Sequence, residues 1–327
     1  MTVTCRKVAL THIVNDWQST GADVLRLDGG QEPGDLGYPA RITVGAGGPD
    51  PGIAPLEAST AARPFQDGSW LSGTRRGEIS VVVPIRVEAS TPEACDAAVA
   101  TLHRFCAQRA GLGAEMSYTV DVSNPAGGAA IPVTLPVSVP HSNALRVELT
   151  DGSQRFLPCE MEVRGFDSAV ASDVDASGAV VCRSVGSVWY SPGLDAASDV
   201  IEEEGFAYGS ISLSPVWTGD VIPDPTFIFT RATTLPGWLI AAAGDRALTL
   251  FGGGGYTTIV VDVSTRRILA KAGTDPLEPA YGQYKSGFWP VGAAGSVSLT
   301  VDGTTFGGTG AGVGGAVVGQ RLHRGWR

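Results

Sequence analysis

Covalent catalysis needs a serine or cysteine nucleophile within reach of a histidine base. The chain has four histidines, His12, His103, His141 and His323, and no GxSxG motif that would present a serine on a sharp turn. No two histidines are spaced as a metal-binding pair such as HxxxH. The sequence therefore predicts a protein that is not an enzyme, with no catalytic, cofactor-binding or metal-binding residue.

One stretch is similar to the first half of a calcium loop. In SDVDASGAV, Asp173, Asp175, Ser177 and Gly178 occupy the spacing of such a loop. An EF-hand loop also needs a glutamate at its twelfth position to bind calcium through both oxygens, and Ser184 stands there instead. A simple turn is therefore the favoured interpretation, and calcium binding is the alternative.

Composition places the chain among β-rich proteins. A length of 327 residues predicts about two domains. Charged residues make up 17% of the chain, and 44 glycines and 21 prolines favour short strands joined by turns over helix bundles. The net charge of −10 argues against a nucleic-acid-binding surface, which would carry a basic stripe.

The cysteines indicate a reducing compartment. Cys5, Cys95, Cys106, Cys159 and Cys182 are odd in number, widely scattered and without a CxxC pair. We expect them to be buried thiols.

Membrane insertion is not expected. The start of the chain, MTVTCRKVALTHIVNDW, lacks the apolar segment of a signal peptide. The uncharged apolar stretch LPGWLIAAAG is too short to span a bilayer.

The clearest strand is GEISVVVPIRVEAS, in which apolar residues from Ile79 to Val87 alternate with more polar ones. This period of two predicts a strand with one buried face. Pro84 lacks a backbone N–H and predicts an edge position or a bulge.

The segment STPEACDAAVATLHRFCAQRAG predicts the single convincing helix. Ser90 and Glu93 have the spacing of a capping box, and Pro92 suits the first turn. Gly111 is expected to end the helix, and His103 to face solvent. The apolar stripe consists of Cys95, Ala98, Val99, Leu102, Phe105 and Cys106.

A second alternating segment, IPVTLPVSVP, places Pro132, Pro136 and Pro140 on one face. Three prolines on one face exclude a central strand, so we expect an edge strand or an extended arm. Such a segment suits contacts between subunits, because it presents backbone without inviting continued strand pairing.

We place a domain boundary at residues 217/218, where WTGDVIPDP gathers proline and aspartate. Beyond it, short strand-like segments recur at spacings of about ten residues, as in a small β-sandwich. Phe288 and Trp289 precede Pro290, which fixes the chain direction into the following strand. We expect both aromatics in the core of this domain or at its seam with the first domain, and a sugar-stacking surface is the alternative.

Three segments, in this order, resemble the distal tail protein (Dit) family of bacteriophages with long, non-contractile tails, whose members are also called minor tail proteins. They are RPFQDGSWLSGTRRGEISVVVPIRVEASTPEACDAAVATLHRF, then ISLSPVWTGDVIPDPTFIFT, then IVVDVSTRRILAKAG with SGFWPVGAAGSVSLTVDG. One departure is Gly295–Ser296, where the family often has asparagine after the glycine. The Gly/Pro-rich residues 28–64 exceed a minimal member and indicate a lineage-specific arm.

The resemblance implies a mainly β protein. Residues 1–217 would form a ring-forming domain similar to tail-tube proteins, with one packed α-helix and the Gly/Pro-rich arm. Residues 218–327 would form an outer β-sandwich similar to galectins and carbohydrate-binding modules. No cofactor is implied.

The resemblance also implies a structural virion protein. A hexameric ring would join the tail tube protein above to the tail-tip or hub protein of the baseplate below, after assembly in the host cytoplasm. DNA would pass through the lumen without specific binding, and acidic side chains facing the lumen would repel its phosphates. The alternative function is a carbohydrate-binding or adhesin module of the tail tip that contacts the host envelope.

Overall fold

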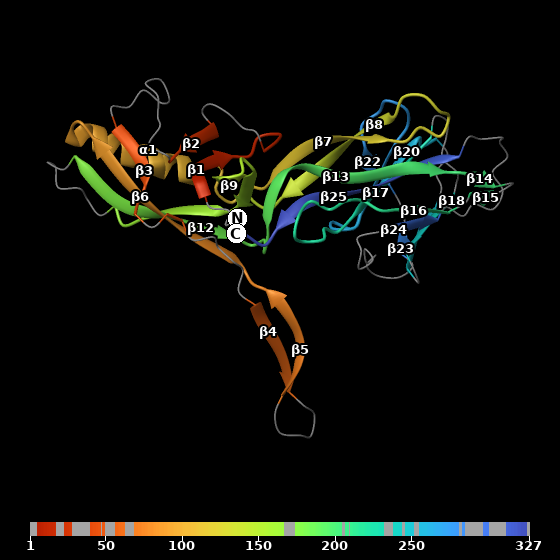
Figure 1. Ribbon diagram of the computed structural model, residues 1–327, viewed down its shortest axis with the longest axis horizontal. Coiled ribbons are helices and arrows are strands. Elements are labelled where there is room, and N and C mark those ends of the chain that lie inside the picture. The colour runs from red at the N-terminus through yellow and green to blue at the C-terminus, as the bar shows by residue number, and fades with distance from the viewer. Residues whose placement is uncertain are drawn as a thin grey trace. The chain divides into compact units, whose positions relative to one another are not determined.

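The chain is mainly β, with one α-helix among the residues that the structure describes, which confirms the expected fold class. The computed structural model (Figure 1) describes residues 5–17, 23–27, 40–46, 48–49, 56–62, 69–166, 174–204, 207–208, 210–231, 238–243, 246–251, 255–280, 283–284, 297–300 and 312–325.

Contacts between residues divide the chain into two compact units. Unit 1 comprises Met1–Ser117, Pro136–Pro192 and Leu322–Arg327, and unit 2 comprises Tyr118–Leu135 and Gly193–Arg321. Four strands have residues in both units: β7 (Ala114–Val122), β8 (Ile131–Val139), β13 (Trp189–Ile201) and β25 (Val313–His323).

Unit 1 contains two larger sheets. The first has the strand order β2-β1-β9-β10-β13, and the second has the order β11-β12-β6-β3. The elements are β1 (Cys5–His12), β2 (Val24–Arg26), β3 (Ala40–Val44), β6 (Ile79–Ala89), α1 (Pro92–Ala107), β9 (Asn143–Leu149), β10 (Gln154–Pro158), β11 (Glu160–Arg164) and β12 (Asp175–Ser184). A separate pair consists of β4 (Leu56–Ala62) and β5 (Ser69–Arg76), which are antiparallel.

One hydrophobic core lies between these sheets and α1. The odd-numbered residues of β6 from Ile79 to Val87 are at most 2% exposed, as the alternation predicted. They join buried residues of β1, β9, β12 and α1 in a single cluster, which includes the fully buried Trp189. In Figure 1, β6 and β12 run side by side and α1 lies on one side of them.

Pro84 does not mark an edge along the whole of β6. The strand lies between β12 and β3, so the prediction that Pro84 marks an edge strand was wrong for β6 as a whole. The pairing with β3 runs from Ala89 to Ile85 and stops there. The carbonyl of Pro84 still accepts a hydrogen bond of 2.7 Å from Gly45 N. The missing N–H therefore falls where the neighbouring strand ends.

The ends of α1 differ from the sequence prediction. Thr91, not Ser90, is the N-cap, and its hydroxyl accepts a hydrogen bond of 3.2 Å from Ala94 N. Pro92 occupies the first turn, as predicted. The helix ends at Ala107, and Gly111 (φ +72°) lies in the turn beyond it.

For the described residues, the calcium-loop interpretation of this stretch was also wrong, and so was the prediction of a simple turn; Asp173 lies outside them. Asp175–Ser184 forms strand β12, which pairs with β6 along its whole length. Asp175, Ser177 and Gly178 are therefore spread along extended backbone, whereas a calcium loop must curl to bring its ligands together. Gly178 is required by packing, because a Cβ there would strike the Phe166 ring and the Arg164 carbonyl.

Unit 2 contains a sheet with the order β13-β25-β17-β20-β21-β22. Phe227 and Phe229 point into one core, whereas Ile228 points into another on the opposite face. The second core includes Val120, Val122, Val133 and Leu135 of β7 and β8. The remaining strands are β14 (Glu203–Glu204), β15 (Ala207–Tyr208), β16 (Ser210–Leu213), β17 (Thr226–Thr230), β18 (Trp238–Ala243), β19 (Arg246–Phe251), β20 (Thr258–Asp262), β21 (Arg267–Lys271), β22 (Glu278–Pro279), β23 (Gln283–Tyr284) and β24 (Val297–Thr300).

Candidate functional site

The proline face predicted for subunit contacts lies on β8. This strand pairs with β7 in a two-stranded sheet, so it is an edge strand, as predicted. Pro132 and Pro140 are exposed and Pro136 is half-buried. The alternate residues Val133 and Leu135 are buried in unit 2. The prolines are thus on the outer side of the strand, and their contact with another subunit stays a prediction.

Phe288 and Trp289 lie outside the described residues. Their expected place in the core or at the domain seam, and the alternative of sugar stacking, stay predictions.

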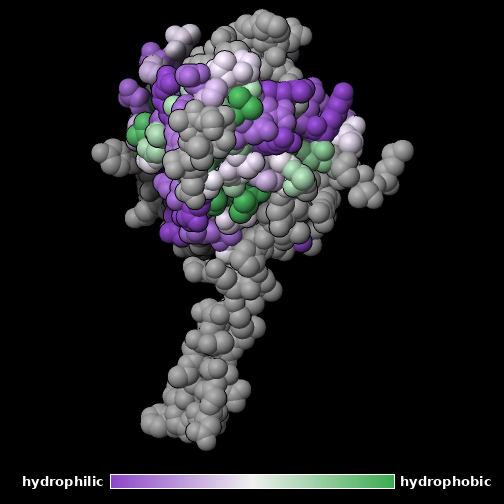
Figure 2. Space-filling view, turned by 90° about the vertical axis from the view of Figure 1, so that its left-hand side faces the viewer, coloured by the Kyte–Doolittle hydropathy of each residue, from purple (hydrophilic) through white to green (hydrophobic). Residues whose placement is uncertain are grey.

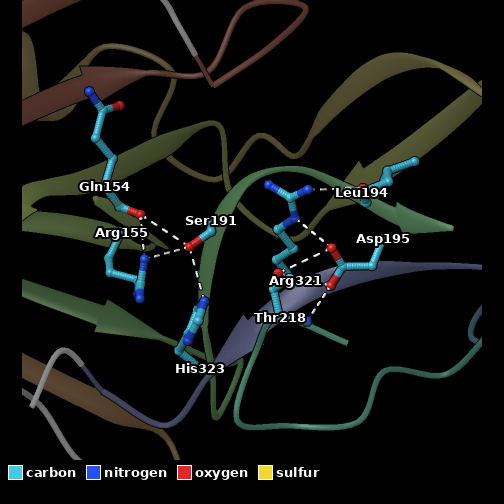
Figure 3. A network of polar contacts seen from close by, with 8 residues as sticks. All are labelled: Gln154, Arg155, Ser191, Leu194, Asp195, Thr218, Arg321 and His323. Atoms are coloured by element: carbon cyan, nitrogen blue, oxygen red, sulfur yellow. Dashed lines mark hydrogen bonds and ion pairs between the residues drawn. The ribbon is translucent and has the colours of Figure 1, made fainter. Parts of the chain in front are cut away.

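The structure brings together a serine and a histidine that are far apart in the sequence. Ser191 Oγ lies 3.0 Å from His323 Nε2, accepts a hydrogen bond of 2.7 Å from Arg155 Nη1, and donates to the Gln154 carbonyl at 3.1 Å (Figure 3). A catalytic serine gives its proton to histidine Nε2, but here the Gln154 carbonyl is a second acceptor for the hydroxyl, and the donor between Ser191 and His323 depends on the tautomer of the ring. Ser191 and His323 are only 9% and 8% exposed. The cluster is therefore arranged to tie backbone segments of unit 1 together.

A second polar cluster lies in unit 2, around the buried carboxylate of Asp195, which is 5% exposed. Its Oδ1 accepts a hydrogen bond of 2.7 Å from Arg321 Nε, and its Oδ2 accepts one of 2.6 Å from Thr218 N. The hydroxyl of Thr218 adds contacts of 3.0 and 3.1 Å, and an Arg321 nitrogen donates to the Leu194 carbonyl at 3.4 Å (Figure 3). The carboxylate thus holds the segment around Thr218 against β13 and β25.

In unit 1, two buried side chains satisfy carbonyls at the end of α1. His12 Nε2 lies 3.0 Å from the Phe105 carbonyl, and Asn143 Nδ2 donates to the Cys106 carbonyl at 3.2 Å. His12 and Asn143 are directly opposite each other on β1 and β9. Because the last carbonyls of a helix have no partners within it, this pair replaces the glycine cap that the sequence predicted.

The electrostatics at His12 favour the neutral ring. Burial lowers the pKa of His12, and the charge of Arg109 lowers it further, whereas the hydrogen bond to Phe105 and the charge of Asp23 raise it. The ring also stacks on Phe105 with centroids 4.0 Å apart. Asp23 Oδ1 lies 3.9 Å from His12 Nδ1.

The cysteines are free thiols, and four of the five are buried. Burial and the neighbouring Cys159 raise the pKa of Cys106 to about 12. The hydrogen bond of the Cys182 thiol to Cys159, together with burial, raises the pKa of Cys182 well above its ordinary value. Because the thiolate is the nucleophile and the metal ligand, these thiols are in the inert form at neutral pH.

Within the described part of the chain, no group of three or more His, Cys, Asp or Glu side chains could hold a metal ion. The helix found there is neither long enough nor apolar enough to cross a bilayer.

Sequence reasoning missed both polar clusters. Ser191 and His323 are hydrogen-bonded although more than 130 positions separate them in the sequence, and neither lies in a sequence motif. One feature of the sequence could have indicated these clusters. Strand β13 carries several polar residues, although most of its side chains are buried or half-buried. Its two aspartates and two serines lie among apolar residues, and the sequence does not show which partners they have.

No protein-family profile matches the sequence, and no curated protein matches it at a significant level. Among solved structures, the chain is similar to the Dit protein (gp 19.1) of phage SPP1. The TM-score is 0.52 at 10% identity, over 96% of this chain and 99% of that chain.

Two structures of the phage p2 baseplate in its activated conformation, with Ca and with Sr, also match. With Ca the TM-score is 0.40 at 7% identity, over 97% of this chain and 98% of that chain. With Sr it is 0.41 at 6% identity, over 95% and 97%. These two scores are too low to carry an argument about the fold. The match to SPP1 Dit covers both chains almost completely and confirms the fold that the three sequence segments indicated. The chain has the fold of a bacteriophage distal tail protein.

Proposed function

We propose that the protein is a structural component of a phage tail tip, a Dit-type ring that joins the tail tube to the tail tip or baseplate. The observation that carries this proposal is the match to SPP1 Dit over 96% of this chain and 99% of that one. The SPP1 protein is described as a paradigm of the hub adsorption apparatus in phages that infect Gram-positive bacteria. We extend the hub role to this chain.

The proposal includes a hexameric ring, with the tail tube protein above, the hub protein below and DNA passing through the lumen. The ring domain would comprise residues 1–217 and the outer domain residues 218–327. This division differs from that into compact units, which places residues 118–135 and 193–217 in unit 2 and residues 322–327 in unit 1. Repetition of one head-to-tail contact closes such a ring when the rotation between copies is a simple fraction of a turn. The outward prolines of β8 support a surface that meets other subunits without open-ended strand pairing.

One observation supports a role without catalysis, and another supports assembly in the host cytoplasm. Ser191 and His323 are only 9% and 8% exposed, so a substrate has little access to this pair. Buried free thiols suit folding in a reducing compartment.

Cryo-electron microscopy of purified virions encoded by the same genome tests the proposal. We expect a sixfold ring at the distal end of the tail tube whose density fits this chain. Mass spectrometry of the same particles should detect the protein in about the copy number of a single ring. Absence from purified virions, or a position in the capsid, would refute the proposal.

A further inference from the structure

The guanidinium of Arg146, on β9 of unit 1, has no acceptor within the described part of the chain. The side chain is half-buried, and its Cζ lies 5.7 Å from the centroid of the Phe156 ring. Among the described residues, no hydrogen bond or ion pair joins the guanidinium to another side chain or to a carbonyl. Burying a charge costs free energy unless the charge is paired. An anion at this position would therefore be stabilised.

Strand register places a second arginine on the same face of the sheet. Arg26 and Arg146 are the cross-strand partners of Ala9, one on each side of it. Val8 and Leu10, the neighbours of Ala9 in β1, belong to the core of unit 1, so Ala9 and both arginines lie on the opposite face. Two strand spacings of about 4.8 Å put the arginine backbones about 10 Å apart. Both long side chains can reach the space above the alanine.

Aromatic side chains hold Arg146 in place. Phe156 is its cross-strand partner on β10 and is fully buried. Trp17 packs against Phe156 and Tyr190, with its ring centroid 4.9 Å and 5.4 Å from theirs. A guanidinium over an aromatic ring is attracted through its charge and keeps its N–H donors for hydrogen bonds. The aromatic contact thus orders the arginine and leaves its donors for a ligand.

The charge of these strands is opposite to that of the chain, whose net charge is −10. Strands β1, β2 and β9 carry the cationic residues Arg6, Lys7, Arg26 and Arg146, and one carboxylate, that of Glu148. Glu148 lies 3.7 Å from Arg6 and 3.5 Å from Lys7, so two other cations share it. Burial lowers the pKa of Arg146; the charge of Glu148 raises it, and that of Arg26 lowers it further. Repulsion between the two arginines is therefore not fully compensated within these strands.

The chemistry of the site selects its ligand. A guanidinium can bind a carboxylate or a phosphate through two parallel hydrogen bonds. The net charge of −10 repels a long polyanion such as DNA from the surface beyond this site, whereas a short acidic segment meets only the cationic strands. Figure 2 shows that the described surface on the α1 side of unit 1 is mainly hydrophilic, with small, separate hydrophobic patches. On that side too, unit 1 offers a protein partner polar rather than broad apolar contacts.

We propose that Arg146 and Arg26 form an anion site on unit 1 that binds a carboxylate of an acidic segment in a partner protein. Arg146 donates N–H groups to the two carboxylate oxygens, and Arg26 adds its positive charge across Ala9. The inference goes beyond the proposed function and does not rest on it, because it uses contacts within unit 1 alone.

Binding of a fluorescent hexaglutamate peptide to the full chain at low salt, measured by fluorescence anisotropy, tests the site. Arg146→Gln should weaken binding about tenfold or more, because a charge-assisted bidentate contact is lost. Arg146→Lys keeps the charge but not the planar fork, so it should weaken binding less. Arg267→Gln is the matched control, because it removes the same charge from an exposed position of β21 in unit 2. Its affinity should stay within about twofold of wild type.

Several results would overturn the inference. They include no saturable binding of hexaglutamate to the wild type, and equal losses in Arg146→Gln and Arg267→Gln. Tighter binding of inorganic phosphate or of hexathymidylate, dependent on Arg146, would assign the site to phosphate instead. Self-association that Arg146→Gln abolishes, seen by analytical ultracentrifugation without any binding of the peptide, would assign it to a second copy of this chain.

A second measurement supplies the carboxylate from within the chain. Ala9→Glu places a carboxylate between Arg26 and Arg146, and Ala9→Gln is its neutral counterpart. Because opposite charges on adjacent strands attract, Ala9→Glu should melt about 2 °C or more above Ala9→Gln at low salt. It should also no longer bind hexaglutamate, since its own carboxylate occupies the site. Equal melting temperatures for the two variants would count against an anion site between the arginines.

Discussion

Asp195→Asn tests whether the carboxylate cluster of unit 2 stabilises the fold. The substitution keeps the shape of the side chain but removes its charge and converts one oxygen into an NH₂ group. Asp195 accepts from Arg321 Nε at 2.7 Å through one oxygen and from Thr218 N at 2.6 Å through the other. An asparagine can accept only one of these, so one donor must face the new NH₂ group.

The magnitude follows from these contacts. Leaving a donor without its acceptor costs about 1–3 kcal/mol, and replacing a charge-assisted bond by a neutral one loses about 1 kcal/mol more. The side chain of Arg321 is 38% exposed, so water compensates part of its lost pairing. We therefore expect the free energy of unfolding to fall by about 2–3 kcal/mol. For a unit of this size the melting temperature should fall by about 5–10 °C.

Thermal and urea unfolding, followed by circular dichroism, measure the effect. Asp262→Asn is the matched control, because the bonds that Asp262 accepts from described residues come from Ser264 and Thr265 within its own turn. A double-mutant cycle with Arg321→Gln isolates the pair, and we expect a coupling energy of at least about 1 kcal/mol. A loss below 0.5 kcal/mol for Asp195→Asn, or a coupling near zero, would refute the reasoning.

Three further predictions concern unit 1. Gly178→Ala should lower the free energy of unfolding by about 1–3 kcal/mol in urea titrations, because the added Cβ meets a ring and a backbone carbonyl. Gly186→Ala should be nearly neutral, since only the Ser184 hydroxyl lies within 4 Å of that position, and equal losses at both would contradict the packing argument. Thr91→Ala should lower the free energy of unfolding by about 1 kcal/mol, because the N-cap hydrogen bond to Ala94 N is lost. A larger loss from Ser90→Ala would contradict this assignment and favour the capping box predicted with Ser90. The pKa of His12 is lowered in the folded state, so the unfolded chain binds the proton more readily. Stability should therefore fall as the pH drops below 6.5, the ordinary pKa of histidine, and His12→Gln should flatten that fall.

Local patterns predicted the β-rich class, the alternating core face of β6 and the position of α1. The stripe from Cys95 to Cys106 is buried as expected, except for the half-buried Val99, because helical spacing alone decides which side chains share a face. The edge position of β8 was predicted from its prolines, because each proline lacks the backbone N–H group that a central strand needs. These predictions succeeded because they depend on residues close together in the chain.

The errors arose where distant segments decide the outcome. Asp175 and Gly178 have the spacing of a loop, but ten backbone pairings with β6 hold them in a strand. The end of α1 is set by His12 and Asn143, which come from two other strands. A sequence does not show such partners, because the same polar residue type can hydrogen-bond either to water or to a carbonyl far away in the chain.

The amino-acid sequence by itself determined the elements, their buried faces and a fold resembling phage distal tail proteins, because periodicity and backbone chemistry act over a few residues. Only the tertiary structure decided which polar groups meet, that Ser191 lies against His323, and that Asp175 and Gly178 belong to a strand. Those properties arise from register and packing between segments far apart, and the free energy of such contacts exists only once the chain has folded.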